Sequence, residues 1–134
     1  MIDTTYLRAL SPGDQIHRGR IRYEYRIGAH FTRRHANPPL WTDLHEHTFH
    51  VTLELAAERP ETGLYGLDMV ALERRLNAWA EVLPPVLNDC PECPHGTTEE
   101  LCHYFARLPL EDHAVLLSVA VAEVPERVTV LRCG

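Results

Sequence analysis

The stretch DLHEHTFHVTLELAAE, residues 43–58, alternates apolar and polar positions after its histidines. One side carries His45, His47, Phe49, Val51, Leu53 and Leu55, and the other carries Thr48, His50, Thr52 and Glu54. Because successive side chains of a strand point to opposite faces, this pattern predicts a strand with one buried face. Two imidazoles therefore stand at the end of an apolar face, which is the first indication of a functional site.

The composition is that of a single globular domain, residues 1–134, with 45% hydrophobic and 24% charged residues. The net charge of −6 and the absence of a basic run disfavour nucleic acid as a partner. No apolar run approaches the roughly 18 residues of a membrane span, and the first residues lack the pattern of a signal peptide. The four cysteines do not form a dense secreted framework, so we expect free thiols and a cytoplasmic location.

The other segments predict a second strand pair and two helices. Residues 20–31 alternate and predict a strand, followed by a loop over residues 32–43 because Asn37-Pro38-Pro39 cannot continue a ladder. Residues 1–18 are expected to form an N-terminal arm or an extra strand. Apolar spacings of three and four after Asp68 predict a helix that stops at Pro84-Pro85, and Thr97 with Glu100 has the spacing of a capping box at the start of a second helix.

Two apolar runs, residues 114–124 and 127–132, predict a last pair of strands joined by a short turn. The element order is β-β-α-α-β-β. Strands that flank paired helices indicate the α+β class, with an antiparallel sheet covered on one face by two helices.

The histidines suggest a metal site. His45 and His47 are two apart on the predicted strand and point the same way, whereas His50 projects from the opposite face. A third ligand must come from elsewhere, and His30, at the end of the preceding strand, is well placed. Three neutral imidazoles with an open fourth position are typical of a catalytic zinc site. The alternative is that this pair is simply surface polarity.

Further motifs resemble the zinc-dependent 6-pyruvoyl-tetrahydropterin synthase and 6-carboxytetrahydropterin synthase family. The similarity runs through GAH at residues 28–30, HEH at 45–47, TGLYGLDMVALE at 62–73, VLNDCPECPHGTTEEL at 86–101 and VAVAEV at 119–124. It covers about residues 20–132 in order. The resemblance implies the tunnelling fold, a homohexamer of two stacked trimers with active sites between subunits, and a pterin or purine-derived substrate.

The same resemblance implies roles for individual residues. The zinc ion (Zn2+) would be held by His30, His45 and His47. The pterin ring would be anchored by the carboxylate of Glu123, in a pocket lined by Thr97, Thr98 and Glu99. The residues themselves also favour a ligand at Glu123: it shares parity with Val115, Val119 and Val121, so its carboxylate ends an apolar face, where paired N–H donors would offset its burial. The alternative is that Glu123 leaves the sheet edge into solvent.

Two features of the family pattern are replaced in this chain. Trp41 stands where the family has a proton-transfer cysteine, and Leu83-Pro84-Pro85 stands where it has Leu-Asp-His. Proton transfer by a positioned group normally contributes about 10²–10⁴-fold, so other groups must supply it if the chain is an enzyme. The candidates are Asp43, His95 and His35, each of which is otherwise a solvated loop residue.

Cys90 and Cys93 form a CPEC motif that resembles half of a zinc ribbon, but a second such pair is absent, so we interpret them as loop cysteines. Three functions follow from the sequence. The first is a zinc-dependent lyase acting on dihydroneopterin triphosphate or a related pterin, with a non-standard acid–base set. The second is a catalytically inactive pterin- or purine-binding homologue, and the third is a structural zinc at an oligomer interface.

Overall fold

The computed structural model describes residues 22–61 and 63–134. Its elements are β1 (Arg22–Asn37), β2 (Trp41–Glu58), α3 (Met69–Glu81), the short 3-10 helix η1 (Leu87–Asp89), α4 (Thr98–Ala106), β3 (Ala114–Val124) and β4 (Arg127–Arg132). The strands form one antiparallel sheet in the order β1-β2-β3-β4. This confirms the predicted α+β class and element order. The expected arm over residues 1–18 and the first two residues of the expected strand 20–31 lie outside the described residues.

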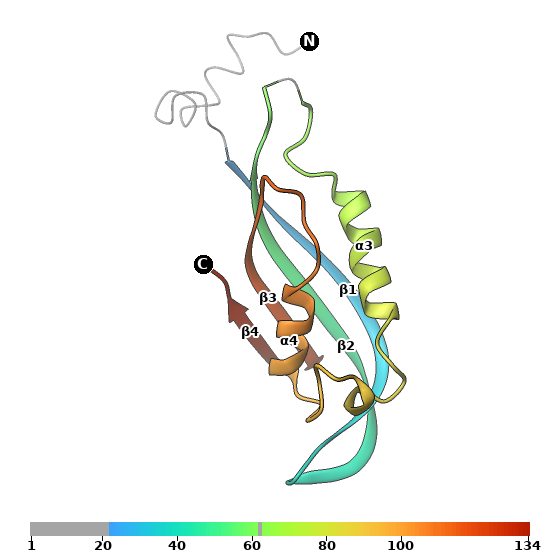
Figure 1. Ribbon diagram of the computed structural model, residues 1–134. Coiled ribbons are helices and arrows are strands. Elements are labelled where there is room, and N and C mark those ends of the chain that lie inside the picture. The colour runs from blue at the N-terminus through green and yellow to red at the C-terminus, as the bar shows by residue number, and fades with distance from the viewer. Residues whose placement is uncertain (1–21, 62) are drawn as a thin grey trace.

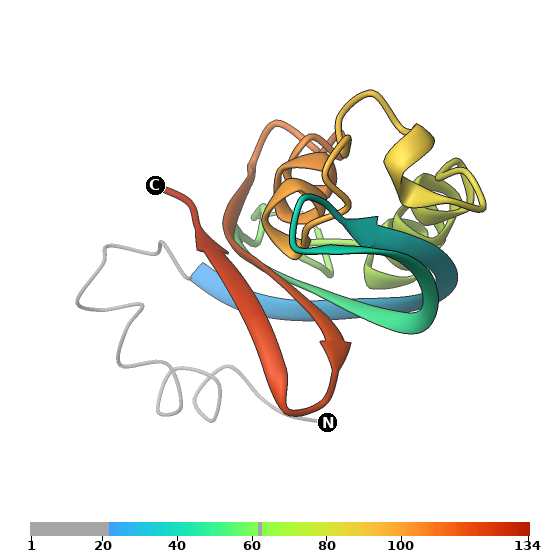
Figure 2. The same ribbon diagram turned by 90° about the horizontal axis from the view of Figure 1, so that it is seen from below.

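Both helices cover the same face of the sheet (Figures 1 and 2). Helix α3 packs along β1, and α4 packs over β3 and β4. The core between the layers is formed by the inward side chains of the strands and the buried stripes of the helices, including Phe31, Phe49, Leu53, Leu72, Leu76, Leu101, Phe105 and Val119. No helix in the described ranges has the length and apolar character that crossing a membrane requires.

The two helices begin where the capping residues predict. Asp68 is the N-cap of α3 and its carboxylate accepts from the backbone N–H of Ala71 at 3.0 Å. Thr97 caps α4 in a complete capping box with Glu100. Because the caps satisfy backbone donors that the helix itself leaves free, they fix the position of each helix start. The start of α4 matters here because it lies beside the candidate site.

The hairpin of β1 and β2 is longer than the sequence predicts. The expected loop over residues 32–43 is wrong, because pairing continues through Arg33↔His47 and His35↔His45 to Asn37↔Trp41. Only the residues between Asn37 and Trp41 make the turn. Since β3 pairs with β2 from Ala57 only as far as His50, this end of the hairpin extends past the end of β3 (Figure 1).

A bulge in β3 changes the alternation of its side chains. Glu54 pairs with Ser118 and Leu55 with Leu116, which leaves Leu117 as an extra residue. Val119 and Val121 are buried under the helices, but Val115, expected to share their face, is 54% exposed. Glu123 therefore shares a face with Val119 and Val121, which follow the bulge, but not with Val115, which precedes it.

Candidate metal centre

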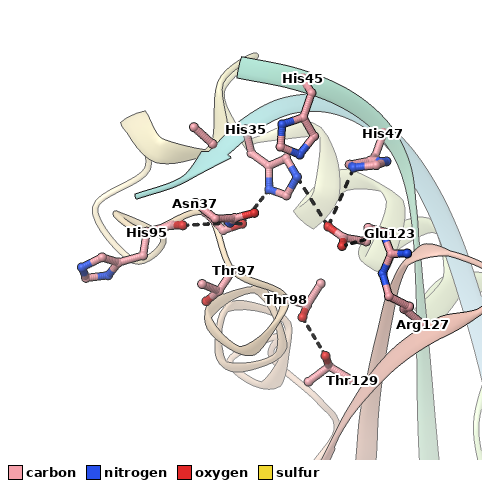
Figure 3. A network of polar contacts seen from close by, with 12 residues as sticks. His35, Asn37, His45, His47, His95, Thr97, Thr98, Glu123, Arg127 and Thr129 are labelled. Atoms are coloured by element: carbon pink, nitrogen blue, oxygen red, sulfur yellow. Dashed lines mark hydrogen bonds and ion pairs between the residues drawn. The ribbon is translucent and has the colours of Figure 1, made fainter. Parts of the chain in front are cut away.

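Three histidines of the extended hairpin come together on the helix-covered face of the sheet (Figure 3). His35 lies on β1 directly opposite His45, and His47 is the next residue on the same face of β2. One nitrogen atom from each ring lies within 4.8 Å of the other two. Elsewhere within residues 22–61 and 63–134, no separate group of three metal-ligating side chains lies so close together.

His30 does not lie beside the other two predicted ligands, and the structure instead brings His35 together with His45 and His47. His30 pairs with His50, and their ring centroids lie 5.7 Å apart. Both side chains are exposed on the face of the sheet that the helices leave open. The physical reason is strand parity, which puts His30 and His35 on opposite faces of β1. His35 thus has the place in the cluster that was assigned to His30.

His35 is buried, with only 1% of its surface exposed. Its Nδ1 lies 2.7 Å from the carbonyl oxygen of Gly96. A carbonyl can only accept, so Nδ1 carries the hydrogen and Nε2 presents a lone pair. This Nε2 has no hydrogen-bond partner in the described part of the chain. Burial lowers the pKa of His35, outweighing the hydrogen bond to Gly96, and the neutral form is the one that binds a metal.

His45 is oriented in the same way by the main chain. Its Nδ1 lies 3.0 Å from the carbonyl oxygen of Asp43, so this nitrogen also donates and leaves Nε2 for a ligand. The side chain of Asp43 is exposed. Asp43, predicted as a proton-transfer group, is therefore placed two residues before His45 and contributes its carbonyl to the site.

The loop before α4 fixes His35 by several backbone contacts. Asn88 accepts from the backbone N–H of Ala36 at 2.9 Å and donates to its carbonyl at 2.9 Å, so it holds the residue after His35 from both sides. Asn37 donates to the carbonyl of Gly96 at 2.9 Å. Gly96 has a φ of +62°, and a Cβ atom there would lie 2.6 Å from the carbonyl oxygen of Ala36. This contact explains why the position requires glycine.

Glu123, at the end of β3, faces the cluster (Figure 3). Its Oε2 lies 3.5 Å from Nε2 of His35 and 3.9 Å from Nε2 of His47. Its Oε1 accepts from the guanidinium of Arg127 at 3.3 Å. The two carboxylate oxygens therefore have different partners: one faces the imidazoles, and the other accepts from an arginine at the start of β4.

The predicted pocket residues at the start of α4 lie close by, and their side chains have partners. Thr97 accepts from the backbone N–H of Glu100 as the helix cap. Thr98 and Thr129 of β4 share a hydrogen bond of 2.6 Å, and Thr98 also donates to Glu99 at 3.3 Å. Figure 3 shows Thr98 on the side of α4 that faces Glu123. Glu99 is exposed.

His95 is not part of the three-histidine cluster. Its ring is directed away from the cluster in Figure 3, its side chain is 66% exposed, and its Nδ1 lies 3.0 Å from a carboxylate oxygen of Glu100. Its carbonyl oxygen accepts from the side chain of Asn37 at 3.1 Å. His95 thus belongs to the loop that supports His35.

Trp41 and the Pro84-Pro85 segment, which the sequence singles out as departures from the family pattern, lie at the start of β2 and beside β1. Trp41 is exposed at the start of β2. The carbonyl of Pro85 accepts from the backbone N–H of Arg34 at 3.0 Å, so the Pro84-Pro85 segment lies against β1.

Cys90 and Cys93 are buried free thiols, and burial raises the pKa of Cys93 to about 12.

The donor set fits a zinc ion. Three imidazoles converge, two of them have Nδ1 held by carbonyl groups, and the buried Nε2 of His35 lacks the partner that a buried polar atom needs. Sequence reasoning missed His35 as a ligand because it ended the first strand too early. The register that pairs Ile27 with Leu53 also pairs His35 with His45. Extending the two alternating segments in this register toward the turn would have placed His35 beside His45.

Comparison with known proteins identifies a family. The family model described as 6-pyruvoyl tetrahydropterin synthase matches residues 22–133. No curated protein matches the chain. Among solved structures, 6-pyruvoyl tetrahydropterin synthase from Caenorhabditis elegans is similar to it with a TM-score of 0.68 and 13% sequence identity, over 85% of this chain and 97% of that one. At this identity the structural match shows the fold alone.

Proposed function

The chain belongs to the 6-pyruvoyl tetrahydropterin synthase family, and on that premise we propose that it is a zinc-dependent lyase acting on dihydroneopterin triphosphate or a related pterin. The observation that carries this proposal is the buried Nε2 of His35, which has no partner among the described residues and faces two further imidazoles. Three neutral imidazoles are the donor set of a catalytic zinc site.

In this proposal His35, His45 and His47 hold the ion. When bound, zinc supplies a Lewis acid that polarises a substrate oxygen. The carbonyls of Gly96 and Asp43 keep two of the imidazoles in the tautomer that presents Nε2. Glu123 accepts hydrogen bonds from the N–H groups of the pterin ring, and Thr97, Thr98 and Glu99 at the start of α4 line the pocket.

Proton transfer must use groups other than those of the family pattern, because Trp41 and Pro84-Pro85 cannot exchange a proton. Asp43 and His95 are the groups we propose for this role. Both side chains are exposed and can exchange protons with solvent. Asp43 is on the hairpin, and His95 is on the loop before α4.

The assembly we propose is the homohexamer of two trimers, in the cytoplasm. Within the described sheet, β1 and β4 are edge strands. Edge strands offer unpaired backbone groups to a neighbouring chain, which supports pairing between subunits. Light scattering on the purified protein measures the mass of the assembly.

Turnover tests the enzymatic proposal. Protein loaded with zinc is incubated with dihydroneopterin triphosphate, and the products are separated by chromatography. We expect conversion by the wild type, its loss in His47→Ala, and its retention in His50→Ala, which removes an imidazole from the same strand on the opposite face. A wild type that holds one zinc per chain and converts no pterin would contradict the proposal.

The replacement of the proton-transfer groups by Trp41 and Pro84-Pro85 favours a second function, that of an inactive pterin- or purine-binding homologue. This function predicts saturable binding of a pterin in calorimetry, weakened in Glu123→Gln, with no product formed. Product formation excludes it.

A further inference from the structure

The contact between Glu123 and His35 joins two atoms that both carry lone pairs. In the neutral imidazole, Nδ1 of His35 donates to Gly96, so the Nε2 that faces Glu123 carries a lone pair and no hydrogen. Its distance to Oε2 of Glu123 is 3.5 Å. Two electron-rich atoms that face each other at a buried position repel unless a cation lies between them.

The spacing of these atoms is close to that of ligands sharing one ion. Zinc binds nitrogen and oxygen at about 2.0–2.2 Å with tetrahedral angles, which separates neighbouring donor atoms by roughly 3.3 Å. Oε2 of Glu123 lies 3.5 Å from Nε2 of His35 and 3.9 Å from Nε2 of His47. The three imidazole nitrogens themselves are within 4.8 Å of one another. The carboxylate oxygen thus lies only about 0.2 Å and 0.6 Å beyond that separation from two of the imidazoles, so a small movement of the side chain would make it a fourth ligand.

Arg127 leaves Oε2 available for this role. Its guanidinium bonds Oε1 at 3.3 Å, so the carboxylate can ligate through one oxygen while the other is held. Within the described part of the chain, the polar contacts of Oε2 are those with the two imidazoles. The side chain is 22% exposed, so it has room to move away from the cluster.

We propose that Glu123 is the fourth ligand of the metal centre in the resting protein, completing a donor set of three imidazoles and one carboxylate. This inference rests on the metal binding in the proposed function. It changes the expected site from one open to solvent into one closed until a ligand displaces the carboxylate. Ligation and recognition of a pterin ring are then alternative uses of the same oxygen.

Cobalt substitution tests the inference without turnover. Co2+ reports its coordination in its visible absorption, and titration gives its affinity. The variant is Glu123→Gln, which keeps the shape of the side chain and loses the charged ligand. The matched control is Glu126→Gln, which removes an exposed carboxylate from the turn between β3 and β4. Thermal melting of the metal-free proteins checks that both variants fold.

We expect Glu123→Gln to bind Co2+ at least about 10-fold more weakly than the wild type. Even the loss of a residue that only contacts a metal ligand costs about 10-fold in affinity, and the loss of a charged ligand should cost no less. Its visible spectrum should differ from that of the wild type, and azide should bind to its cobalt form at lower concentration, because the fourth position is open. Glu126→Gln should match the wild type in all three measurements.

The outcomes separate the two proposals. If the wild type binds one Co2+ and Glu123→Gln shows the same spectrum, affinity and azide response, the fourth-ligand inference is overturned and the proposed function stands. If the wild type binds neither Co2+ nor Zn2+, both are overturned. If Glu123→Gln fails to fold, Glu123→Ala with azide as the added fourth ligand takes its place, and an azide response equal to that of the wild type overturns the inference.

Discussion

His35 and His45 are cross-strand partners in the β1–β2 hairpin, with ring centroids 4.4 Å apart in an edge-to-face arrangement. Each ring has its Nδ1 on a backbone carbonyl, of Gly96 for His35 and of Asp43 for His45. The pair is therefore oriented by the main chain on both sides. Because carbonyl groups cannot be removed by substitution, this orientation depends on the backbone of the hairpin and of the loop before α4.

The first prediction separates the two candidate ligands on β1. His35→Ala should lose stoichiometric zinc. Loss of a residue that only hydrogen-bonds to a metal ligand costs up to about 100-fold in affinity, so loss of a ligand itself should cost more than that. His30→Ala should retain zinc because His30 lies on the opposite face. Elemental analysis of the dialysed proteins measures this. Loss of zinc in His30→Ala alone would restore the sequence-based set.

The second prediction concerns Gly96. Alanine there must adopt a φ of +62° and place its Cβ 2.6 Å from the carbonyl of Ala36. We expect Gly96→Ala to lower the free energy of unfolding by about 1–3 kcal/mol and to weaken zinc binding, because its own carbonyl orients His35. Urea unfolding and zinc titration measure the two effects.

Gly63→Ala is the control for Gly96→Ala. Gly63 has no positive φ, and the atoms nearest to its Cβ would belong to Pro60 at 3.5 Å, an ordinary van der Waals distance. It should leave both measurements unchanged. Equal zinc affinity in Gly96→Ala and the wild type would show that the carbonyl does not position His35.

The third prediction is a pH dependence of the metal-free protein. The pKa of His35 in the folded state lies below the ordinary histidine value of 6.5, chiefly because burial disfavours the charged imidazole. The unfolded chain therefore binds the proton more readily. The contribution of neutral His35 to stability is fully present above about pH 6.5 and is lost as the pH falls through the folded pKa.

Urea unfolding between pH 7 and 5, with a chelator present, measures this dependence. His35→Gln should show a shallower loss of stability over this range than the wild type. His103→Gln, which removes an exposed histidine from α4, should follow the wild-type curve. Identical curves for His35→Gln and the wild type would rule out His35 as the source.

The fourth prediction concerns Glu100, which supports the same loop. Burial alone would raise the pKa of this carboxyl, but hydrogen bonds from Thr97 and His95 outweigh it and hold the pKa below the ordinary glutamate value of 4.5. Its carboxylate accepts from the backbone N–H groups of Thr97 at 3.1 Å and His95 at 3.0 Å. Glu100→Ala should cost about 1–2 kcal/mol at pH 7, as the loss of a helix cap does.

Because the folded pKa of Glu100 is lowered, its stabilisation is present above about pH 4.5 and is lost as the pH falls through the folded value. The difference in unfolding free energy between Glu100→Ala and the wild type should therefore shrink toward pH 3. Glu99→Ala, at the neighbouring exposed position, serves as the control. A difference that stays constant with pH would assign the effect to packing instead of charge.

Much of the fold could be predicted because its signals are local. The alternation of residues 45–55, the helical spacing after Asp68 and the capping box at Thr97 each depend on neighbours in the chain. Each was confirmed in the structure. The bulge at Leu117 has no such signal, since it arises from how β3 fits against β2, and Val115 was therefore placed on the wrong face.

The site was predicted in part for the same reason. His45 and His47 share a face by strand parity alone. His35 was missed as a ligand because Pro38-Pro39 was taken to end the strand well before it, whereas the prolines occupy only the turn. The approach of Glu123 could not be derived, because it depends on how far the hairpin extends past the end of β3.

All three imidazoles come from one short segment, residues 35–47, so only a short loop separates them in the unfolded chain. Closing so short a loop costs little entropy, and an ion that also binds the unfolded chain stabilises the native state by less than its affinity suggests. The residue that fixes His35 is Gly96, which is synthesised much later. During synthesis, the three histidines would thus bind the metal weakly at first. The affinity would rise only when the loop before α4 had packed against the hairpin and oriented His35.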